Sequence, residues 1–132
     1  MPRILVIETE ASLRAVIGQS LTGSGHEILE APNGEEGLRV WHARGADLVL
    51  AEVLMPGTGG ITVILELHTF APGLPIIALV GGEQTRELGM LADANLLGAV
   101  GLLQKPFSLG ELLLAVSAAL PAEPPGTHAR TA

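Results

Sequence analysis

Short apolar runs alternate five times with segments in which apolar residues recur every three to four positions. A continuous apolar run is typical of a strand buried on both faces, and a three-to-four spacing is typical of an amphipathic helix. The predicted strands are residues 3–7, 27–31, 47–52, 74–80 and 99–103.

The segments between the strands carry helix signals. Their inward faces are predicted at Leu13, Val16, Ile17 and Leu21, at Leu38 and Trp41, at Ile61, Ile64, Leu65 and His68, at Leu88, Leu91 and Ala92, and at Leu109, Leu112, Leu113, Val116 and Leu120. Asn33 with Glu36, and Ser108 with Glu111, have the spacing of an N-cap residue and the third residue of its helix. Periodicity stops at Pro121, so we expect one domain over residues 1–120 and a Pro/Ala-rich linker or tail over 121–132.

Strict strand–helix alternation with short connections predicts a parallel sheet with right-handed crossovers. We therefore expect an α/β fold, a (βα)5 doubly wound five-stranded sheet of flavodoxin-like order 2-1-3-4-5 with helices on both faces. Ligands bind such sheets at the carboxyl ends of the strands. Here those ends carry Glu8 and Thr9, Glu52, Val80 and Lys105, so ionisable groups of opposite sign are predicted to converge on one edge.

Composition excludes several classes of function. The formal charge is −7, and the seven basic residues are scattered singly, so no basic stripe is available to bind the phosphates of a nucleic acid. No apolar run approaches the roughly 18 residues of a membrane span, and the chain has no cysteine for disulfide or thiolate chemistry. We expect a soluble, cytoplasmic domain without direct nucleic-acid or membrane binding.

Several motifs resemble the receiver domain of two-component response regulators. The chain reads "ILVIETE" where receivers typically read ILVVDDE, and "APNGEEGL" where they read A-x-N/D-G-x-E-A-L. It reads "DLVLAEVLMPGTGG" where they read DLVLLDVMMPGMDG, and Lys105-Pro106-Phe107 follows the fifth predicted strand. The resemblance runs from Arg3 to Leu120 and implies phosphoryl transfer from a histidine kinase to an Asp, with Mg²⁺ bound by an acidic pair.

The residues that would carry this chemistry depart from the family pattern. Glu52 stands in the place of the phosphoacceptor Asp, and the acidic pair has become Glu8 and Thr9. The resemblance places the Mg²⁺ site at Glu8, Thr9, Glu52 and the backbone carbonyl of Leu54. Because Thr9 offers only a neutral hydroxyl, we expect this site to bind Mg²⁺ weakly or to stay empty, and we expect no tightly bound cofactor.

Two further positions lack the usual side chains. Val80 replaces the Ser/Thr hydroxyl that contacts the phosphoryl group, and Leu102 replaces the usual switch aromatic. Lys105 alone matches the family pattern, and we expect it to pair with Glu52, since a partly buried carboxylate needs a cationic partner. The resemblance also suggests a cis bond before Pro106, which would aim Lys105.

These departures predict an atypical receiver that acts by phosphorylation-independent protein–protein interaction, not by enzymatic catalysis. The extra methylene of Glu52 moves the carboxylate by up to ~1.5 Å, and ~1 Å of misplacement can cost about a hundredfold in rate. The alternative is a functional phosphoacceptor that a histidine kinase phosphorylates with Mg²⁺. A hydrolase that uses the acidic edge is the third reading, but the sequence offers it no nucleophile or oxyanion donors.

Other readings of single residues stay open. Glu52 could be a strand-end charge that faces solvent, Thr9 could be the N-cap of the first helix, and Glu10 could stabilise the dipole of that helix.

The expected partners are a histidine kinase or another signalling protein, and an output domain. Receivers commonly use the face of the fourth helix, fifth strand and fifth helix, here Gln84 to Leu120. Its apolar residues are compatible with a homodimer or docking surface and equally compatible with core packing.

Overall fold

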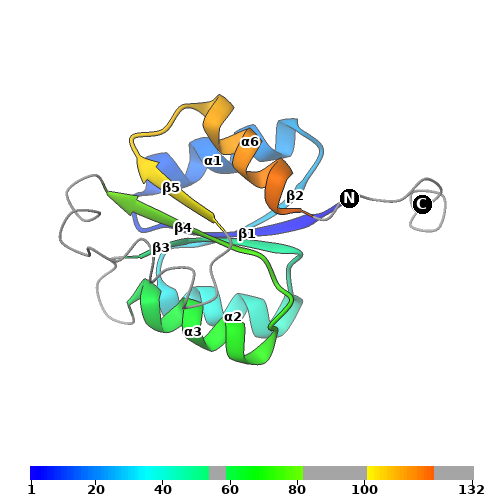
Figure 1. Ribbon diagram of the computed structural model, residues 1–132, viewed down its shortest axis with the longest axis vertical. Coiled ribbons are helices and arrows are strands. Elements are labelled where there is room, and N and C mark those ends of the chain that lie inside the picture. The colour runs from blue at the N-terminus through cyan, green and yellow to red at the C-terminus, as the bar shows by residue number, and fades with distance from the viewer. Residues whose placement is uncertain (54–58, 82–100, 121–132) are drawn as a thin grey trace.

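A computed structural model describes residues 1–53, 59–81 and 101–120 as a parallel sheet between two layers of helices (Figure 1). The strands are β1 (Arg3–Ile7), β2 (Glu27–Ala31), β3 (Leu48–Glu52), β4 (Ile76–Gly81) and β5 (Gly101–Lys105). The helices are α1 (Ala11–Gly23), α2 (Gly34–Arg44), α3 (Gly60–Phe70) and α6 (Leu109–Ala119). The strand order is β2-β1-β3-β4-β5 with every pair parallel, which confirms the predicted fold class.

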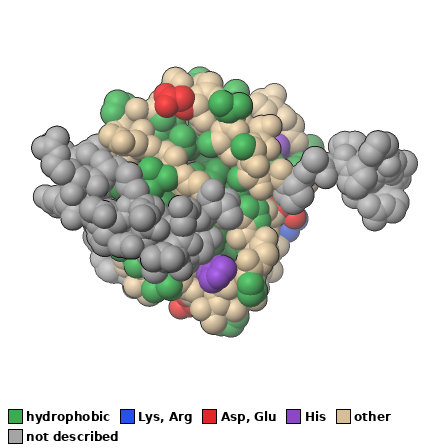
Figure 2. All heavy atoms as spheres, viewed as in Figure 1, with side chains coloured by type: hydrophobic (Ala, Val, Ile, Leu, Met, Phe, Trp, Pro, Cys, Tyr) green, Lys and Arg blue, Asp and Glu red, His purple; other side chains and the backbone are tan. Residues whose placement is uncertain are grey.

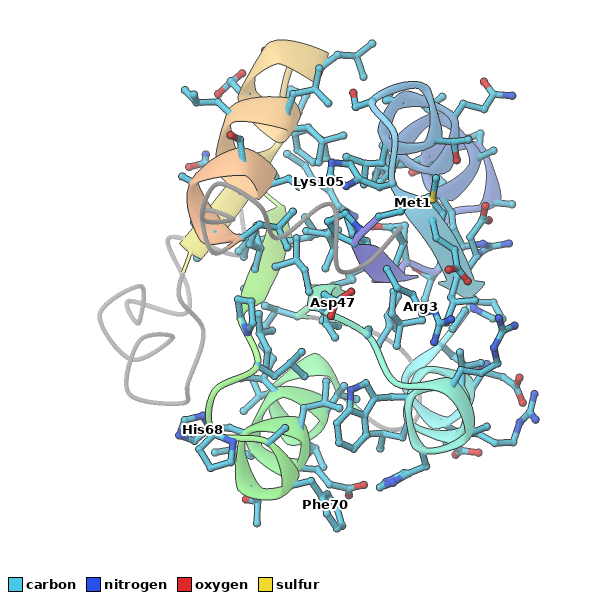
Figure 3. The ribbon with its side chains drawn as sticks, turned by 90° about the vertical axis from the view of Figure 1, so that its right-hand side faces the viewer. Met1, Arg3, Asp47, His68, Phe70 and Lys105 are labelled. Carbon is cyan, nitrogen blue, oxygen red and sulfur yellow. The ribbon has the colours of Figure 1, made fainter. Side chains whose placement is uncertain are left out.

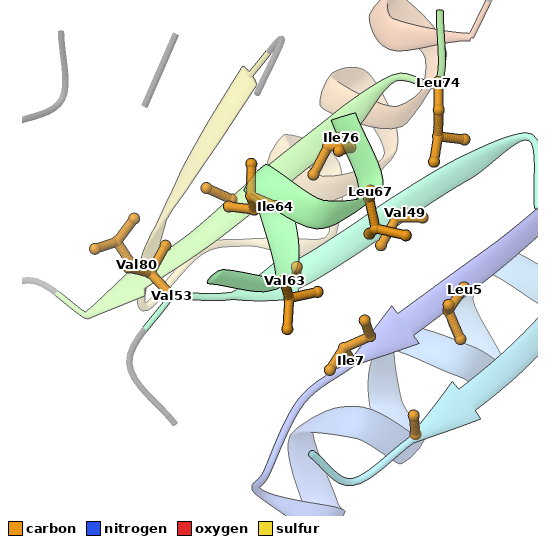
Figure 4. Packing of buried hydrophobic residues seen from close by; sticks show 13 residues of the cluster. Leu5, Ile7, Val49, Val53, Val63, Ile64, Leu67, Leu74, Ile76 and Val80 are labelled. Atoms are coloured by element: carbon orange, nitrogen blue, oxygen red, sulfur yellow. The ribbon is translucent and has the colours of Figure 1, made fainter. Parts of the chain in front are cut away.

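The sheet divides the core into two halves because successive side chains on a strand point to opposite faces. Helices α1 and α6 cover one face, and α2 and α3 cover the other (Figures 1 and 3). Between the sheet and α2 and α3 lie Leu5, Ile7, Val49, Val63, Leu67 and Val80 (Figure 4). Between the sheet and α1 and α6 lie Ile4, Val6, Leu50, Leu79, Leu103 and Leu112.

Helix starts follow the predicted capping pattern. The Asn33 side chain accepts a hydrogen bond from the backbone N–H of Glu36 at 2.8 Å. Ser108 and Glu111 form both hydrogen bonds of a capping box, at 2.9 and 3.0 Å, which fixes where α6 begins after β5. The prediction that Thr9 caps the first helix is wrong, because Glu10 occupies the N-cap position and makes no side-chain cap bond.

Several predicted boundaries and faces are corrected by the structure. β5 covers Gly101–Lys105 instead of 99–103, so Lys105 is the last residue of the strand. Four apolar residues assigned to inward helix faces are exposed, because each lies at the rim of its helix's buried stripe: Val16, Leu65, Leu109 and Leu113. The predicted fourth helix and the predicted tail over 121–132 lie outside the described residues.

The amino end of the sheet is held by a polar network around Arg3. Its backbone N–H donates to Asp47 Oδ2 at 2.7 Å, and its guanidinium contacts Glu27 Oε2 at 3.0 Å and the backbone carbonyl of Arg44 at 2.6 Å (Figure 3). These bonds join the starts of β1, β2 and β3 to the end of α2. The charges at this edge thus serve packing, in contrast to those at the carboxyl edge.

Gly60 lets the first turn of α3 press against the end of β3. A Cβ at this position would overlap the backbone carbonyl oxygen of Glu52 and lie 2.5 Å from Val53 Cα, while the Gly60 N–H donates to Val53 O at 2.8 Å. Backbone atoms cannot rotate away as a side chain can. The glycine therefore fixes the approach of α3 to the strand that carries Glu52.

We predict that Gly60→Ala lowers the free energy of unfolding by about 1–3 kcal/mol or more, as overpacking of a filled site does. Gly23→Ala is the matched control, because its Cβ would meet nothing within 4 Å. That variant should be neutral or slightly stabilising. Urea unfolding followed by circular dichroism measures both, and equal stabilities of the two variants would contradict this account of Gly60.

Candidate functional site

Strand alternation brings three ionisable side chains to the same face at the carboxyl edge of the sheet. Glu8 directly follows β1, Glu52 ends β3 and Lys105 ends β5. Each stands two residues after a core residue that faces α1 and α6, these being Val6, Leu50 and Leu103. Because side chains two apart share a face, all three point toward the layer of α1 and α6.

The Lys105 ammonium lies between the two carboxylates. Lys105 Nζ is 2.7 Å from Glu8 Oε1 and 2.9 Å from Glu52 Oε2. The Glu8 side chain is fully buried, and the side chains of Glu52 and Lys105 are 12% and 21% exposed. A single positive charge therefore serves two negative charges in a largely buried place, where ionic interactions are stronger than at the surface.

The second oxygen of the Glu52 carboxylate is also occupied. Glu52 Oε1 accepts hydrogen bonds from the Thr9 backbone N–H at 3.0 Å and from the Thr9 hydroxyl at 2.6 Å. The Thr9 hydroxyl is thus committed to Glu52, which explains why it does not cap α1. Glu52 points into this cluster, so its reading as a solvent-facing charge is wrong.

The lysine has to pass across one strand to reach Glu52, because β4 lies between β3 and β5, and Glu8 after β1 lies one strand further on. Adjacent strands are about 4.8 Å apart, so roughly 10 Å separates the backbones of Lys105 and Glu52. In the β4–β5 register Lys105 pairs with Gly81, which has no side chain to block the crossing. The extra methylene of Glu52 shortens the remaining gap from the other side.

Arg14, which the sequence analysis did not single out, helps to hold the loop between β1 and α1. Arg14 Nη1 donates to the backbone carbonyl of Glu8 at 2.7 Å, and the Glu10 N–H donates to Glu8 Oε2 at 3.0 Å. Arg14 is the only charged residue of α1, and its position one turn into the helix is the signal that could have pointed to this role. Together these bonds fix the turn that presents Thr9 to Glu52.

The cluster shifts the pKa values of its two carboxyl groups in opposite directions. Burial raises the pKa of Glu52, but hydrogen bonds from Lys105 and then from Thr9 outweigh burial and hold this pKa below its ordinary value. Burial raises the pKa of Glu8 above its ordinary value, and Lys105 and the Glu10 N–H offset this only in part. Burial lowers the pKa of Lys105, yet its bonds to Glu52 and Glu8 leave it above the ordinary value.

The remaining predicted site residues contribute no polar group to the cluster. Val80 is 1% exposed and packs in the core on the side of α2 and α3 (Figure 4). Leu102 is partly buried against the same half of the core. The Lys105–Pro106 peptide bond is cis. Leu54, whose backbone carbonyl was a predicted Mg²⁺ ligand, lies outside the described residues.

The described residues do not form a fitting donor set for Mg²⁺. A hard divalent cation needs about six oxygen ligands, several of them free carboxylates or waters. Here the ammonium already bridges Glu8 and Glu52, and Thr9 donates to the carboxylate that would have to bind metal. Within the described part of the chain, no group of three acidic or histidine side chains is arranged to bind a metal ion.

An open hollow of about 390 Å³ lies beside the cluster, between the start of α1 and the start of α6. Its walls come mainly from Leu13, Pro106 and Phe107, with Glu10 and Lys105 contributing polar groups. The site is therefore a lysine and two carboxylates at the edge of a parallel sheet, bordered by apolar surface.

None of the helices in the described part has the length and hydrophobicity that a bilayer crossing requires.

A five-stranded parallel sheet of this order, with acidic groups and a lysine at its carboxyl edge, defines a class of signalling module. The sequence profile described as "Response regulator receiver domain" matches residues 4–117. This match covers most of the chain, and the chain belongs to the family of response regulator receiver domains of two-component systems. Proteins of this family exchange signals with histidine kinases and output domains.

Individual relatives agree with this assignment. The chain is 34% identical over 126 residues to the phosphate regulon transcriptional regulatory protein PhoB of Pseudomonas aeruginosa, covering 93% of this chain and 53% of that protein. It is 29% identical over 127 residues to the transcriptional regulatory protein GlrR of Escherichia coli, covering 96% of this chain and 28% of that protein. The chain thus spans about half or less of the length of these relatives.

A solved structure shows the same fold. The receiver domain of NtrX from Brucella abortus superposes with a TM-score of 0.82 at 25% sequence identity, covering 91% of this chain and 99% of that one. The superposition covers most of this chain and almost all of that domain. It therefore supports the fold independently of the motifs.

We predict that Glu8→Gln and Glu52→Gln change stability in opposite directions at neutral pH. The raised pKa of Glu8 means that its charged form costs stability above the ordinary glutamate pKa of about 4.3, so Glu8→Gln should stabilise the protein at pH 7. The lowered pKa of Glu52 means that its charged form contributes stability there, so Glu52→Gln should destabilise it. The Glu8 difference should shrink as the pH falls toward about 4.3, whereas the Glu52 difference should shrink only as the pH falls below that value, through the lowered pKa of Glu52.

Urea unfolding at a series of pH values measures both differences. The two variants serve as each other's control, since they make the same chemical change within one cluster. Destabilisation by both variants at neutral pH would contradict the separation of the two pKa values.

We predict that Lys105→Met lowers the free energy of unfolding by about 1–3 kcal/mol at pH 7, because it leaves two buried carboxylates without their cation. Adding Glu8→Gln to Lys105→Met should recover part of the loss, since only one carboxylate then remains charged. Arg39→Met is the control, because its partner Glu36 lies on the exposed surface of α2. An effect of Lys105→Met no larger than that of the control would contradict the bridging role of Lys105.

Proposed function

We propose that this domain is an atypical receiver that signals by phosphorylation-independent protein–protein interaction. The observation that carries the proposal is that both oxygens of the Glu52 carboxylate already have partners. Oε1 accepts two hydrogen bonds from Thr9, and Oε2 pairs with Lys105. A phosphoacceptor needs a free carboxylate oxygen that can attack phosphorus in line with the leaving group.

The missing side chains support the same proposal. Phosphoryl transfer depends on charge stabilisation by preorganised donors and metal ions as the phosphoryl group is transferred. Val80 has no hydroxyl to donate, Thr9 supplies no charge to a metal, and Lys105 is neutralised by two carboxylates. We infer that the domain has no catalytic role, that Mg²⁺ binds weakly, and that no cofactor is held tightly.

The proposed partners follow from the family. The partner would be a histidine kinase, another signalling protein or an output domain, and it would bind the domain in its single, unphosphorylated state. The face over residues 84–120 is a candidate contact region. The receiver unit would span residues 1–120, with 121–132 as a linker or tail. Because the cluster is built from strand ends that the core fixes, the presented surface would not depend on a phosphorylation cycle.

The second candidate is a working phosphoacceptor that a histidine kinase phosphorylates with Mg²⁺. The family assignment favours it, because the fold and Lys105 are those of the family. It requires Mg²⁺ to displace the ammonium from Glu8 and Glu52. Saturable Mg²⁺ binding at millimolar concentration, measured by calorimetry, would favour this candidate over the first.

We predict that incubation with acetyl phosphate and Mg²⁺ leaves the mass of the intact chain unchanged. The reason is that Glu52 has no free, correctly placed oxygen. A phosphoryl group would add about 80 Da, which mass spectrometry of the intact protein resolves. A stoichiometric adduct located at Glu52 by peptide mapping would refute the proposal.

A variant that restores the family pattern provides the control. Thr9→Asp, Glu52→Asp and Val80→Thr together supply the metal carboxylate, the shorter acceptor and the hydroxyl. We expect this triple variant to gain the adduct with acetyl phosphate and Mg²⁺, which shows that the assay can detect it. Glu52→Asp alone should stay unmodified, since two of the three parts are still missing.

A further inference from the structure

Glu30 is a charged residue on the face of strand β2 that α1 covers. It stands two residues after Ile28, which packs against the half of the core under α1 and α6. Because side chains two apart on a strand share a face, the Glu30 side chain also points toward α1. β2 is an edge strand of the sheet, and the Glu30 side chain remains 45% exposed there.

Helix α1 leaves room for this carboxylate. A Cβ at Gly18 would come within 2.7 Å of Glu30 Oε2, so the glycine lets the carboxylate lie directly against the helix. Arg14 lies one turn before Gly18 and therefore on the same side of α1. The carboxylate thus lies beside the helix backbone and within reach of the arginine.

The Arg14 guanidinium connects Glu30 with the turn after β1. Glu30 Oε1 lies 3.5 Å from Arg14 Nε, and Arg14 Nη1 donates to the backbone carbonyl of Glu8 at 2.7 Å. The Arg14 side chain is only 19% exposed, so it depends more on an anionic partner than a surface arginine does. Because the guanidinium is planar and rigid, a carboxylate that fixes Nε also fixes the direction in which Nη1 donates.

The turn that Arg14 holds is the one that occupies Glu52. Thr9 directly follows Glu8, and its backbone N–H and hydroxyl both donate to Glu52 Oε1. The Glu8 N–H also donates to the Ala31 carbonyl at 3.1 Å, which joins the end of β2 to the same turn. Strand β2 therefore contacts this turn through a backbone bond and through the guanidinium.

We propose that Glu30 is a positioning residue that acts through Arg14 to keep Thr9 on the Glu52 carboxylate. The inference rests on the proposed function, because the contact with Thr9 is what occupies one oxygen of that carboxylate. It deepens the proposed function by adding a residue of the edge strand to the control of this contact. Since Glu30 is partly exposed, a partner that binds at the edge strand would reach the functional site through it.

Amide hydrogen exchange of the full chain, followed residue by residue by NMR, tests this role. Glu30→Gln should speed exchange of the Thr9 amide by about two- to fivefold, the range that corresponds to a partly exposed ion pair. Glu27→Gln is the matched control, because Glu27 lies on the same strand, is 37% exposed and pairs with Arg3. This pair lies at the opposite edge of the sheet, where acidic and basic surface adjoin at the right of Figure 2, so the control should leave Thr9 exchange unchanged.

The Val53 amide separates a local effect from a general one. It donates to the Leu79 carbonyl at 2.9 Å within the sheet, so its exchange follows the stability of the fold. Glu30→Gln should speed exchange at Val53 less than at Thr9. A merely structural role of Glu30 would speed exchange at both amides alike.

A double-mutant cycle tests whether the effect passes through Arg14. Arg14→Met should speed exchange of the Thr9 amide at least as much as Glu30→Gln does, and adding Glu30→Gln to Arg14→Met should have no further effect. Gly18→Ala tests the same link without removing a charge, because its Cβ must displace the Glu30 carboxylate. Alanine favours the helix, yet Thr9 exchange should still rise in this variant.

Three results would each overturn the proposal. They are unchanged Thr9 exchange in Glu30→Gln or Gly18→Ala, equal changes at Thr9 and Val53, and a full effect of Glu30→Gln in the Arg14→Met background. Failure of the proposed function would look different, because a phosphoryl adduct at Glu52 is detected by mass, whereas the exchange rates are measured without Mg²⁺ or a phosphoryl donor.

Discussion

The ion pairs that join Lys105 to Glu8 and Glu52 are the interaction on which the carboxyl edge of the sheet depends. Three strands end there with charges on the same face, and without the ammonium two buried carboxylates would face each other. The cost of leaving a buried charge unpaired is several kcal/mol, so this arrangement constrains every residue around it. Gly81 leaves the path of the lysine open, Thr9 completes the shell of Glu52, and Arg14 fixes the turn after β1.

The same cluster accounts for the proposed loss of phosphotransfer. In the family pattern the edge carries an excess of carboxylates that a divalent cation neutralises, whereas here Thr9 replaces one carboxylate and the lysine pairs with the two that remain. A site that is satisfied by its own residues has less to gain from Mg²⁺ or a phosphoryl group. The domain would then present the same surface at all times, and its partners would respond to its abundance and location, not to its phosphorylation.

Much of the fold and part of the site could be predicted from sequence, for reasons that particular residues illustrate. Continuous apolar runs placed all five strands, and Asn33 and Ser108 marked their helices correctly, because these signals are local. The partnership of Lys105 with Glu52 followed from the motif pattern, but that of Lys105 with Glu8 did not, since it depends on the strand order and on the open path over Gly81. The exposure of Val16 and Leu113 was missed because helical spacing identifies an apolar stripe and not its edges.

A crystal structure of the chain grown with excess Mg²⁺ and beryllofluoride, a mimic of the phosphoryl group, tests the central claim most directly. We expect Lys105 Nζ to remain between Glu8 and Glu52, with Thr9 still donating to Glu52 and neither ion at the carboxyl edge. A Mg²⁺ ion bound to Glu8 and Glu52, with beryllofluoride attached to the Glu52 carboxylate and the ammonium displaced, would contradict the account.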